Sequence, residues 1–441
     1  MSSLSVSHKA DTSLFYAYLA LLAWIPLPLG SNRPWAICLM SVMVFALLGY
    51  WLILHIRKPL STGTTFSRSL PVLGLLLTAP LWAAFQLLLD ISIDPANTLQ
   101  SSLSGFALAG LFSLTLLMVR SQRRIKLLCY VLVGSGLFQA LYGSMMTLTG
   151  IEYLFFVPKD TYLGTATGTF VNRNHLAGYL VLTLSVGIGL MISTLDGQSA
   201  TNWRDFFRRI LTTLLGNKAR LRIILVMMVA GLVMTHSRMG NSAFFASLAI
   251  AGVLALLLSK RSTKATIVLI SSLIIIDLFV VGTFFGVEKV VQRLENSSET
   301  SETRDEVNTY TLGAIQDNML TGTGAGTYYT NFPAYRQYDV GGYFYDHAHN
   351  DYFEFASDYG VVVTGCLMLA VLWTFISAIR AQINRKTALM RGIAFSATMA
   401  IIALAIHSTV DFNLQIPANA ATFVVILALG QISLYQKSRR S

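Results

Sequence analysis

Long apolar runs, separated by short polar segments, recur along the whole chain. A membrane-crossing helix needs about 20 predominantly apolar residues, and on that basis the pattern predicts twelve spans. They cover approximately residues 14–30, 35–55, 70–89, 102–119, 127–149, 175–194, 222–236, 241–259, 265–285, 352–379, 392–410 and 416–436. The sequence therefore predicts an all-α, polytopic membrane protein in which residues 1–441 form a single membrane domain.

The composition supports a chain whose main solvent is lipid. Only 12% of the residues are charged, whereas soluble domains contain about 25%. The three cysteines, Cys38, Cys129 and Cys366, all lie within apolar runs, and no two of them form a CxxC pair. The cysteines therefore predict neither a disulfide framework nor a zinc site.

The basic residues predict the orientation. If the N-terminus is cytoplasmic and the spans alternate, 24 of the 32 Lys and Arg residues fall in cytoplasmic segments, as the positive-inside rule requires. Of the acidic residues, only Asp11, Asp196 and Asp205 are then cytoplasmic. We therefore expect both termini in the cytoplasm of an inner-membrane protein. The formal charge of +11 is then a topology signal facing anionic lipid, and does not indicate nucleic-acid binding.

Two of the predicted outer segments are long, residues 150–174 and residues 286–351. The second contains amphipathic helical patterns, the glycine-rich turn TGTGAGTYY and an aromatic-rich stretch. This segment is too long and too patterned for a plain connector. It predicts a helical loop domain between the ninth and tenth spans.

Two outer arginines are candidates for ligand binding. Arg173 lies in GTFVNRNHLAG, and Arg238 lies in MTHSRMGNS between two predicted spans. An arginine near lipid usually has a partner or a ligand, although snorkelling to lipid headgroups is the alternative. The polar neighbours Asn172 and His175 favour a polar pocket. Guanidinium groups bind phosphate well.

The histidines gather on the same side. Five of the seven lie at the outer ends of predicted spans: His175, His236, His347, His349 and His407. Histidine is the usual general base near neutral pH. His347 and His349 could instead ligate zinc with Asp346 and Asp351, and Asn350 and Asp351 could cap the tenth helix.

A transporter and a structural scaffold are the competing classes of protein. Asp277, within IIIDLFVVG, is the one carboxylate deep in a predicted span, and coupling-ion sites of transporters have this character. A scaffold would tolerate changes at all of these polar positions. The chain has no P-loop, no HExxH and no Asp-x-Asp pair, so a diphosphate substrate would have to be bound by arginines.

Several motifs together resemble the bacterial O-antigen ligase family. They are TGTFVNRNHLAGYL, the HSRMG turn, DNMLTGTGAGTYY, NFPAYRQYD, HNDYFEFASDYGVVVTG and HSTVDFNLQIPANA. Their order and their shared outer location extend the resemblance over about residues 160–420. One departure is visible, because Val363 stands where the family's second glycine is expected.

The resemblance implies a membrane-embedded, GT-C-like glycosyltransferase that is inverting and metal-independent and uses no cofactor. Its donor is a glycan on undecaprenyl diphosphate, its acceptor is lipid A–core, and the reaction takes place on the periplasmic face among membrane lipids. Relatives with the same motif act as O-antigen polymerases or as protein O-oligosaccharyltransferases, and the sequence leaves these alternatives open.

The resemblance also suggests roles for individual residues. His349 is the candidate general base, and Arg173 and Arg238 are candidates for stabilising the diphosphate leaving group. Candidates for substrate binding are Arg304, Asn172, His175 and His347.

Overall fold

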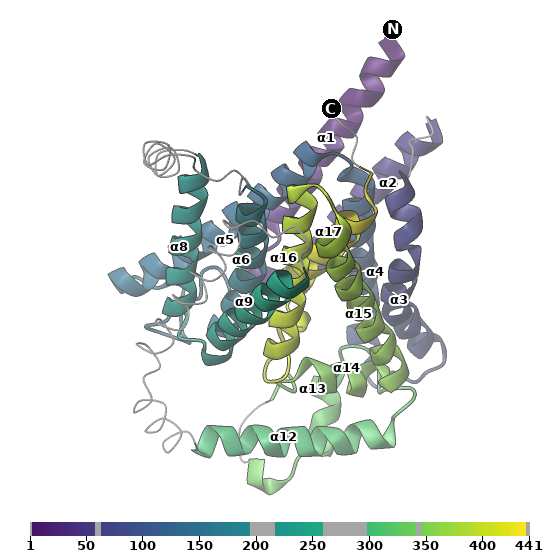
Figure 1. Cartoon of the computed structure of the whole chain (residues 1–441). Coiled ribbons are helices and arrows are strands. Elements are labelled where there is room, and N and C mark those ends of the chain that lie inside the picture. The colour runs from purple at the N-terminus through teal and green to yellow at the C-terminus, as the bar shows by residue number, and fades with distance from the viewer. Residues whose placement is uncertain (1, 58–62, 195–216, 259–297, 341–344, 438–441) are drawn as a thin grey trace.

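The chain folds into a helical bundle, shown by a computed structural model that describes residues 2–57, 63–194, 217–258, 298–340 and 345–437. The long helices pack side by side, and α12 (Ser298–Asp317) lies across one end of the bundle (Figure 1). Within the described residues, nine helices are long and apolar enough to cross a membrane. The protein is therefore an all-α, multi-pass membrane protein, as the hydropathy pattern predicts.

The nine helices correspond to nine of the twelve predicted spans. They are α2 (Pro34–Arg57), α3 (Gly63–Leu88), α4 (Pro95–Met118), α5 (Gln122–Thr149), α6 (Arg173–Ser193), α9 (Arg238–Leu258), α15 (Val361–Asn384), α16 (Ala388–His407) and α17 (Pro417–Tyr435). The first and seventh predicted spans form α1 (Ser2–Trp24) and α8 (Asn217–Met234), which do not meet the same combined criteria of length, hydropathy and low charge. The ninth, 265–285, lies outside the described residues.

The prediction of one continuous span over 352–379 is wrong at its start. The structure divides this stretch into α14 (Asp351–Tyr359) and α15, with Gly360 at the break. Gly360 has a φ of 79°, which glycine adopts without the steric penalty of a side chain. A Cβ atom at this position would lie 2.4 Å from the carbonyl oxygen of Leu320. The close approach of the preceding loop therefore requires the glycine and ends the helix.

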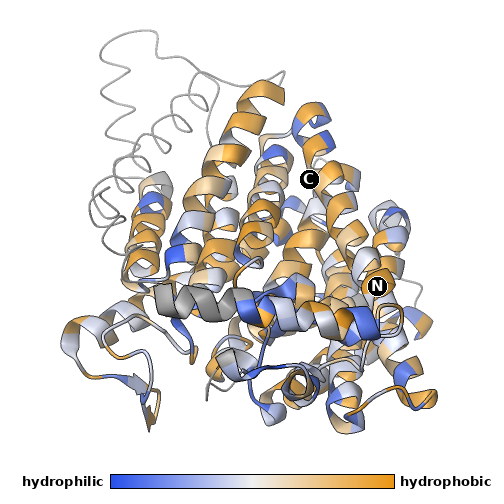
Figure 2. Ribbon diagram, turned by 90° about the horizontal axis from the view of Figure 1, so that it is seen from below, coloured by the Kyte–Doolittle hydropathy of each residue, from blue (hydrophilic) through white to orange (hydrophobic). Residues whose placement is uncertain are grey.

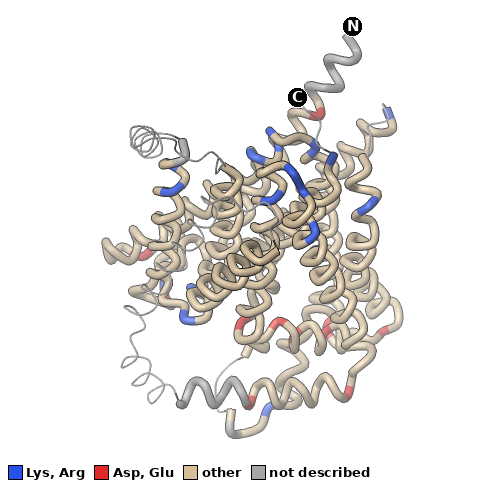
Figure 3. Tube along the Cα trace, in the orientation of Figure 1, with Lys and Arg blue, Asp and Glu red and all other residues tan. Residues whose placement is uncertain are grey.

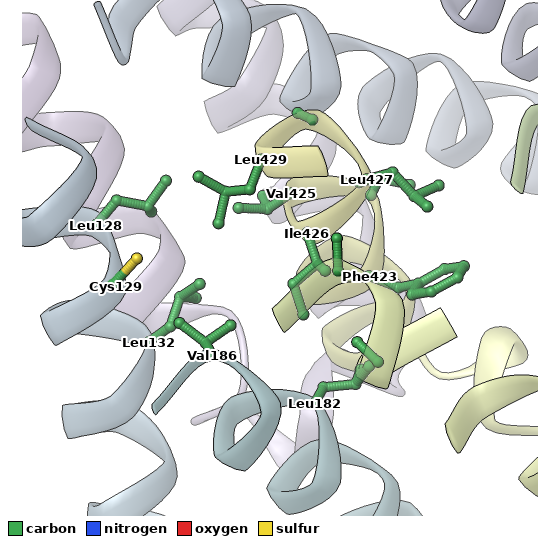
Figure 4. Close-up of a cluster of buried hydrophobic side chains, with 14 of the residues drawn as sticks. Leu128, Cys129, Leu132, Leu182, Val186, Phe423, Val425, Ile426, Leu427 and Leu429 are labelled. Carbon is green, nitrogen blue, oxygen red and sulfur yellow. The ribbon is translucent and has the colours of Figure 1, made fainter. Parts of the chain in front are cut away.

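Helices α6, α16 and α17 form the centre of the bundle, and α6 packs most extensively against α16. Small residues allow this approach, since a Cβ atom at Gly189 would lie 2.2 Å from the carbonyl oxygen of Gly392. Such small-residue contacts are typical of helix packing in membranes. Apolar side chains from α5, α6 and α17 fill the space beside them, including Leu132, Val186 and Ile426 (Figure 4).

The shorter elements lie at the ends of the helices. They are η1 (Leu29–Ser31), β1 (Tyr153–Leu154), β2 (Val157–Pro158), α13 (Tyr328–Asn331), η2 (Phe332–Ala334), η3 (Tyr338–Val340) and η4 (Asn413–Gln415). Strands β1 and β2 pair antiparallel as a hairpin. The described part of the segment 286–351, from residue 298 onward, contains α12, α13, η2 and η3 and is thus largely helical.

Charge is distributed unequally between the two ends of the bundle. Most Lys and Arg side chains lie near the end that carries both termini, and most Asp and Glu side chains lie toward the end covered by α12 (Figure 3). Hydrophobic residues predominate along the helices between these ends (Figure 2). The bundle therefore has two chemically different ends separated by an apolar middle.

Candidate active site

The first turns of α6 and α9 lie against each other and bring two predicted site residues to neighbouring helix starts. Arg173 is the first residue of α6, and Arg238 is the first residue of α9. The helices approach so closely that a Cβ atom added to Gly240 would lie 2.5 Å from the Cβ of Ala177. Helix N-termini carry partial positive charge and unpaired N–H groups. This corner of the molecule therefore favours an anion.

Side chains fix both helix starts. The Oδ1 atom of Asn172 accepts a hydrogen bond from the N–H of Asn174 at 2.8 Å, which makes Asn172 the N-cap of α6. Before α9, the hydroxyl of Ser237 accepts a hydrogen bond from the N–H of Gly240 at 3.2 Å. Asn172 thus has a structural role, and its predicted role in substrate binding stays a prediction.

The two arginines differ in their surroundings. Arg173 is half-buried, and its guanidinium carbon lies 5.6 Å from the centre of the Tyr162 ring, a cation–π geometry. The Nε atom of Arg173 is buried and has no hydrogen-bond partner within the described part of the chain. Arg238 is exposed. Arg173 therefore retains hydrogen-bonding capacity in a place where a ligand could use it.

Asp411, in the turn after α16, is the meeting point of three histidines. Its carboxylate oxygens lie 3.8 Å from Nε2 of His175, 4.0 Å from Nδ1 of His349 and 3.5 Å from Nε2 of His407. Burial opposes ionisation of Asp411, but its contacts with the imidazoles of His407 and His175 outweigh burial and lower its pKa below the usual range. The buried carboxylate is therefore ionised and can orient imidazole N–H groups.

Phe412 holds the histidines in place. Its ring centre lies 4.1 Å from that of His347, 4.6 Å from that of His175 and 4.9 Å from that of His349. His349 has a φ of 50°, a left-handed conformation that costs a non-glycine residue about 1–3 kcal/mol and is concentrated at functional sites. The structure thus brings the predicted residues His175, His347 and His349 together around one aromatic ring.

His347 is paired with a carboxylate of its own. Its Nδ1 lies 2.6 Å from Oε1 of Glu354, and Oε2 of Glu354 accepts a hydrogen bond from the N–H of Ala348 at 2.9 Å. Burial alone would lower the pKa of His347, but the charge and hydrogen bond of Glu354 raise it to about 9. The ring is therefore an imidazolium at neutral pH.

The start of α14 joins the histidine segment to the turn after α16. Asn350 caps α14, because its Oδ1 accepts hydrogen bonds from two N–H groups of the first turn, in agreement with one of the sequence-based interpretations. Asp351 lies within the helix, where its carboxylate accepts a hydrogen bond from the hydroxyl of Ser408 at 2.6 Å. The N–H of Asp351 also donates to the carbonyl of Asp411 at 3.2 Å. His349 and Asp411 are thus connected through the backbone.

A cavity of about 640 Å³ opens beside this cluster, between helices α2, α3 and α4 and helices α14 to α17. Its end near α14 is lined by polar groups that include Tyr328, Asp346, His347 and Glu354. The walls within the bundle are apolar and include Leu76, Leu108, Val371, Phe375, Phe423 and Leu427. Such a cavity fits a hydrocarbon chain that ends in a polar group.

Other candidates cannot be placed in the site. Arg304 belongs to α12, but its side chain is outside the described residues, as is the whole of Asp277.

The two histidines considered as zinc ligands, His347 and His349, face different carboxylates, those of Glu354 and Asp411. Among the described residues, no three His, Cys, Asp or Glu side chains are grouped so that they could hold a metal ion.

Three residues of the cluster are absent from the sequence-based candidates: Asp411, Phe412 and Glu354. A weak signal existed for Asp411, which lies four residues after His407 at the outer end of a predicted span. Its proximity to His175 and His349, however, depends on how α6, α14 and α16 pack. This packing cannot be predicted from the local pattern of the sequence.

Comparison with known proteins identifies the central part of the chain. Residues 223–368 match the family model described as O-antigen ligase. These residues belong to the O-antigen ligase family. The match includes Arg238, His347, His349 and Glu354, and it confirms the resemblance drawn from the motifs. A search of curated proteins found no match.

The match over residues 223–368 implies an enzyme of the glycosyltransferase or ligase type. It also implies a lipid-linked glycan as substrate and membrane lipid as surroundings. Arg173, His175 and Asp411 lie outside the matched residues and are brought to the site by the fold.

Proposed function

We propose that the protein transfers a glycan from undecaprenyl diphosphate to lipid A–core on the periplasmic face of the bacterial inner membrane, which yields lipopolysaccharide. The observation that carries the proposal is the position of His349 beside Asp411, next to the arginine-bearing start of α6. His175 provides the link, because it lies two residues after Arg173 and contacts the same Asp411. The candidate base His349 and the anion-binding start of α6 thus lie close together in a membrane protein.

His349 acts as general base in this proposal. Its imidazole takes the proton of an acceptor hydroxyl as that oxygen attacks the anomeric carbon of the donor sugar. The new glycosidic bond forms on the face opposite the diphosphate, so the anomeric configuration inverts. Asp411 orients the imidazole and stabilises the imidazolium that forms. The present 4.0 Å separation would shorten on substrate binding, as is common for catalytic pairs in unliganded enzymes.

The leaving group departs with the electron pair of the broken carbon–oxygen bond. Undecaprenyl diphosphate thereby gains negative charge on its terminal phosphate oxygen. Arg173 and Arg238, at adjacent helix starts, would neutralise this charge together with the N–H groups of α6 and α9. Stabilisation of developing charge by preorganised groups in a water-poor site is usually the largest single contribution to the rate. Metal-independent catalysis follows if these groups replace a divalent ion.

The protonated ring of His347 adds a further positive group to the proposed site. It lies at the junction between the cavity and the Phe412 cluster, where Glu354 fixes its orientation. We assign it to substrate binding, along with Asn172 and His175, and Arg304 remains a candidate on sequence grounds. The apolar cavity is the proposed location for the hydrocarbon chain of a lipid substrate.

The distribution of charge supports the proposed orientation. The basic end of the bundle would face the cytoplasm, and the end that carries α12 and the histidine cluster would face the periplasm. Both termini would then be cytoplasmic.

In vitro transfer tests the proposed reaction. Purified protein is mixed with undecaprenyl-diphosphate-linked glycan and lipid A–core, and the products are separated on a glycan-stained gel. We expect a ladder of glycan attached to lipid A–core. Longer glycan that remains on the polyprenyl carrier would contradict the ligase assignment and indicate a polymerase. Movement of the lipid-linked glycan across a vesicle bilayer without a new bond would indicate a transporter.

A further inference from the structure

A row of adjacent aromatic rings extends from α5 to the tip of the hairpin formed by β1 and β2. The ring centres of Phe138 and Tyr142 are 5.8 Å apart, those of Tyr142 and Phe155 are 5.6 Å apart, and those of Phe155 and Phe156 are 6.4 Å apart. We refer to these four residues as the aromatic ladder. Its last ring, Phe156, is 95% exposed.

The hairpin is held firmly against α5 despite this exposure. The hydroxyl of Tyr142 donates a hydrogen bond to the carbonyl of Tyr153 at 2.7 Å and accepts one from the N–H of Phe155 at 3.0 Å. At the base of the hairpin, the buried ammonium of Lys159 pairs with Glu152 and donates to the carbonyl of Thr165 at 2.8 Å. The tip and the base of the hairpin are therefore both fixed, so the exposed rings have a defined position.

The surface around the aromatic ladder is apolar. Exposed large hydrophobic residues continue along α5 and through the following loop: Met145, Leu148, Ile151, Val157 and Leu163. Seen along the bundle axis, the hairpin projects outward from the edge of the bundle (Figure 2). The hairpin thus extends the outward-facing surface of a helix that is long and apolar enough to cross a membrane.

We infer that the hairpin of β1 and β2 is an anchor that inserts its aromatic ladder into the lipid interface of the outer leaflet. Lipid is the occupant that the structure favours, because the ladder begins on the face that α5 presents to the bilayer and continues without a break. Aromatic rings with a polar end, such as Tyr142 and Tyr153, are enriched at the membrane–water boundary. A two-residue turn has backbone groups that need water or headgroups, which places the tip at the interface and not in the hydrocarbon core.

The anchor is connected to the proposed site. The loop that follows the hairpin carries Tyr162, whose ring lies against the guanidinium of Arg173. The N–H of Ala166 in the same loop donates to the carbonyl of Met234 at the end of α8, shortly before Arg238. The lipid-inserted hairpin thereby holds the loop that positions Arg173 at a constant depth relative to the membrane surface.

Tryptophan fluorescence in lipid vesicles tests this anchor without depending on transfer activity. The full-length variant Phe156→Trp is reconstituted in phosphatidylcholine vesicles with or without bromine on the acyl chains near the headgroup. The emission of the wild type, which has six tryptophans, is subtracted. Tyr338→Trp serves as the matched control, because Tyr338 in η3 is fully exposed at the end of the bundle.

We expect the added emission of Phe156→Trp to be blue-shifted and largely lost in brominated vesicles, whereas Tyr338→Trp responds only to aqueous acrylamide. If Phe156→Trp responds to acrylamide and not to brominated lipid, the hairpin faces water and the inference is wrong. If neither quencher acts on it, protein covers the hairpin and the inference is equally wrong. Val157→Trp, at the neighbouring exposed position, repeats the measurement if the first variant does not fold.

Discussion

At the scale of single residues, the site depends on which carboxylate each histidine contacts. Glu354 holds His347 as an imidazolium, whereas Asp411 faces His175, His349 and His407. Neighbouring histidines in one short segment thus have different partners, and in the proposed mechanism one serves as a cation and the other as a base. This division could not be obtained from the sequence, where His347 and His349 stand two residues apart in similar surroundings.

The pair formed by His347 and Glu354 predicts a specific pH dependence. The pKa of His347 is raised to about 9, so its positive charge is present at neutral pH and is lost as the pH rises through that value. Transfer should fall on the alkaline side in the same range. Glu354→Gln removes the carboxylate that raises the pKa, while burial, which lowers it, remains. We therefore expect the alkaline limb of kcat/KM to move to lower pH.

The measurement is the pH profile of transfer by the Glu354→Gln variant and the wild type. Asp317→Asn, at an exposed carboxylate that accepts a hydrogen bond from Tyr335, is the control and should leave the profile unchanged. A profile that is lower at every pH but keeps its alkaline limb would show that Glu354 acts only on the stability of the fold.

At the scale of helices, the important feature is the junction of two N-termini. Gly240 lets the first turn of α9 approach Ala177 on α6, and the approach sets the spacing of Arg173 and Arg238. The sequence predicts both helices, because each is a long apolar run. It also predicts both arginines as site residues, because each lies outside the predicted cytoplasmic segments, where most basic residues fall. Which two of the predicted spans lie side by side depends on packing, which periodicity does not encode.

The break at Gly360 illustrates the same limit. The stretch 352–379 has the hydropathy of one span, but contacts with a distant loop divide it. In that loop, the N–H of Gly326 donates to Asp358 at 2.7 Å. From α3, the side-chain amide of Gln86 donates to the carbonyl of Asp358 at 2.8 Å. Contacts between residues so far apart in the chain are not visible in a local pattern.

Two glycine variants separate the helix junction from a general effect of glycine. In Gly240→Ala, the new methyl group must displace Ala177, and overpacking of this kind costs typically about 1–3 kcal/mol. We expect a lower melting temperature and reduced transfer. Gly365→Ala is the matched control within α15, because its Cβ would meet no atom within 4 Å and helix propensity favours alanine by roughly 1 kcal/mol. Equal behaviour of the two variants in thermal melts and transfer assays would contradict the proposed importance of the junction.

At the scale of the whole molecule, the important features are the two differently charged ends of the bundle and the cavity between its helices. The acidic, histidine-rich end lies opposite the basic end, and the 640 Å³ cavity connects the histidine cluster to the apolar interior. A lipid-linked substrate can thus keep its hydrocarbon chain in an apolar environment while its polar group reaches the site. The sequence predicts the sidedness from charge alone, whereas the cavity results from the packing of α2 to α4 against α14 to α17.

The most direct test of the account compares transfer by the wild type and by His349→Ala, with EDTA present throughout. A positioned general base contributes about 10²–10⁴-fold to the rate, so we expect a loss of that order in His349→Ala and full activity of the wild type in EDTA. His55→Ala is the control, because His55 lies in the last turn of α2 and outside the proposed site. It should retain activity, and both variants should melt like the wild type. Near-normal transfer by His349→Ala, or loss of wild-type activity in EDTA with recovery on adding a divalent metal, would contradict a metal-independent reaction that uses His349 as its base.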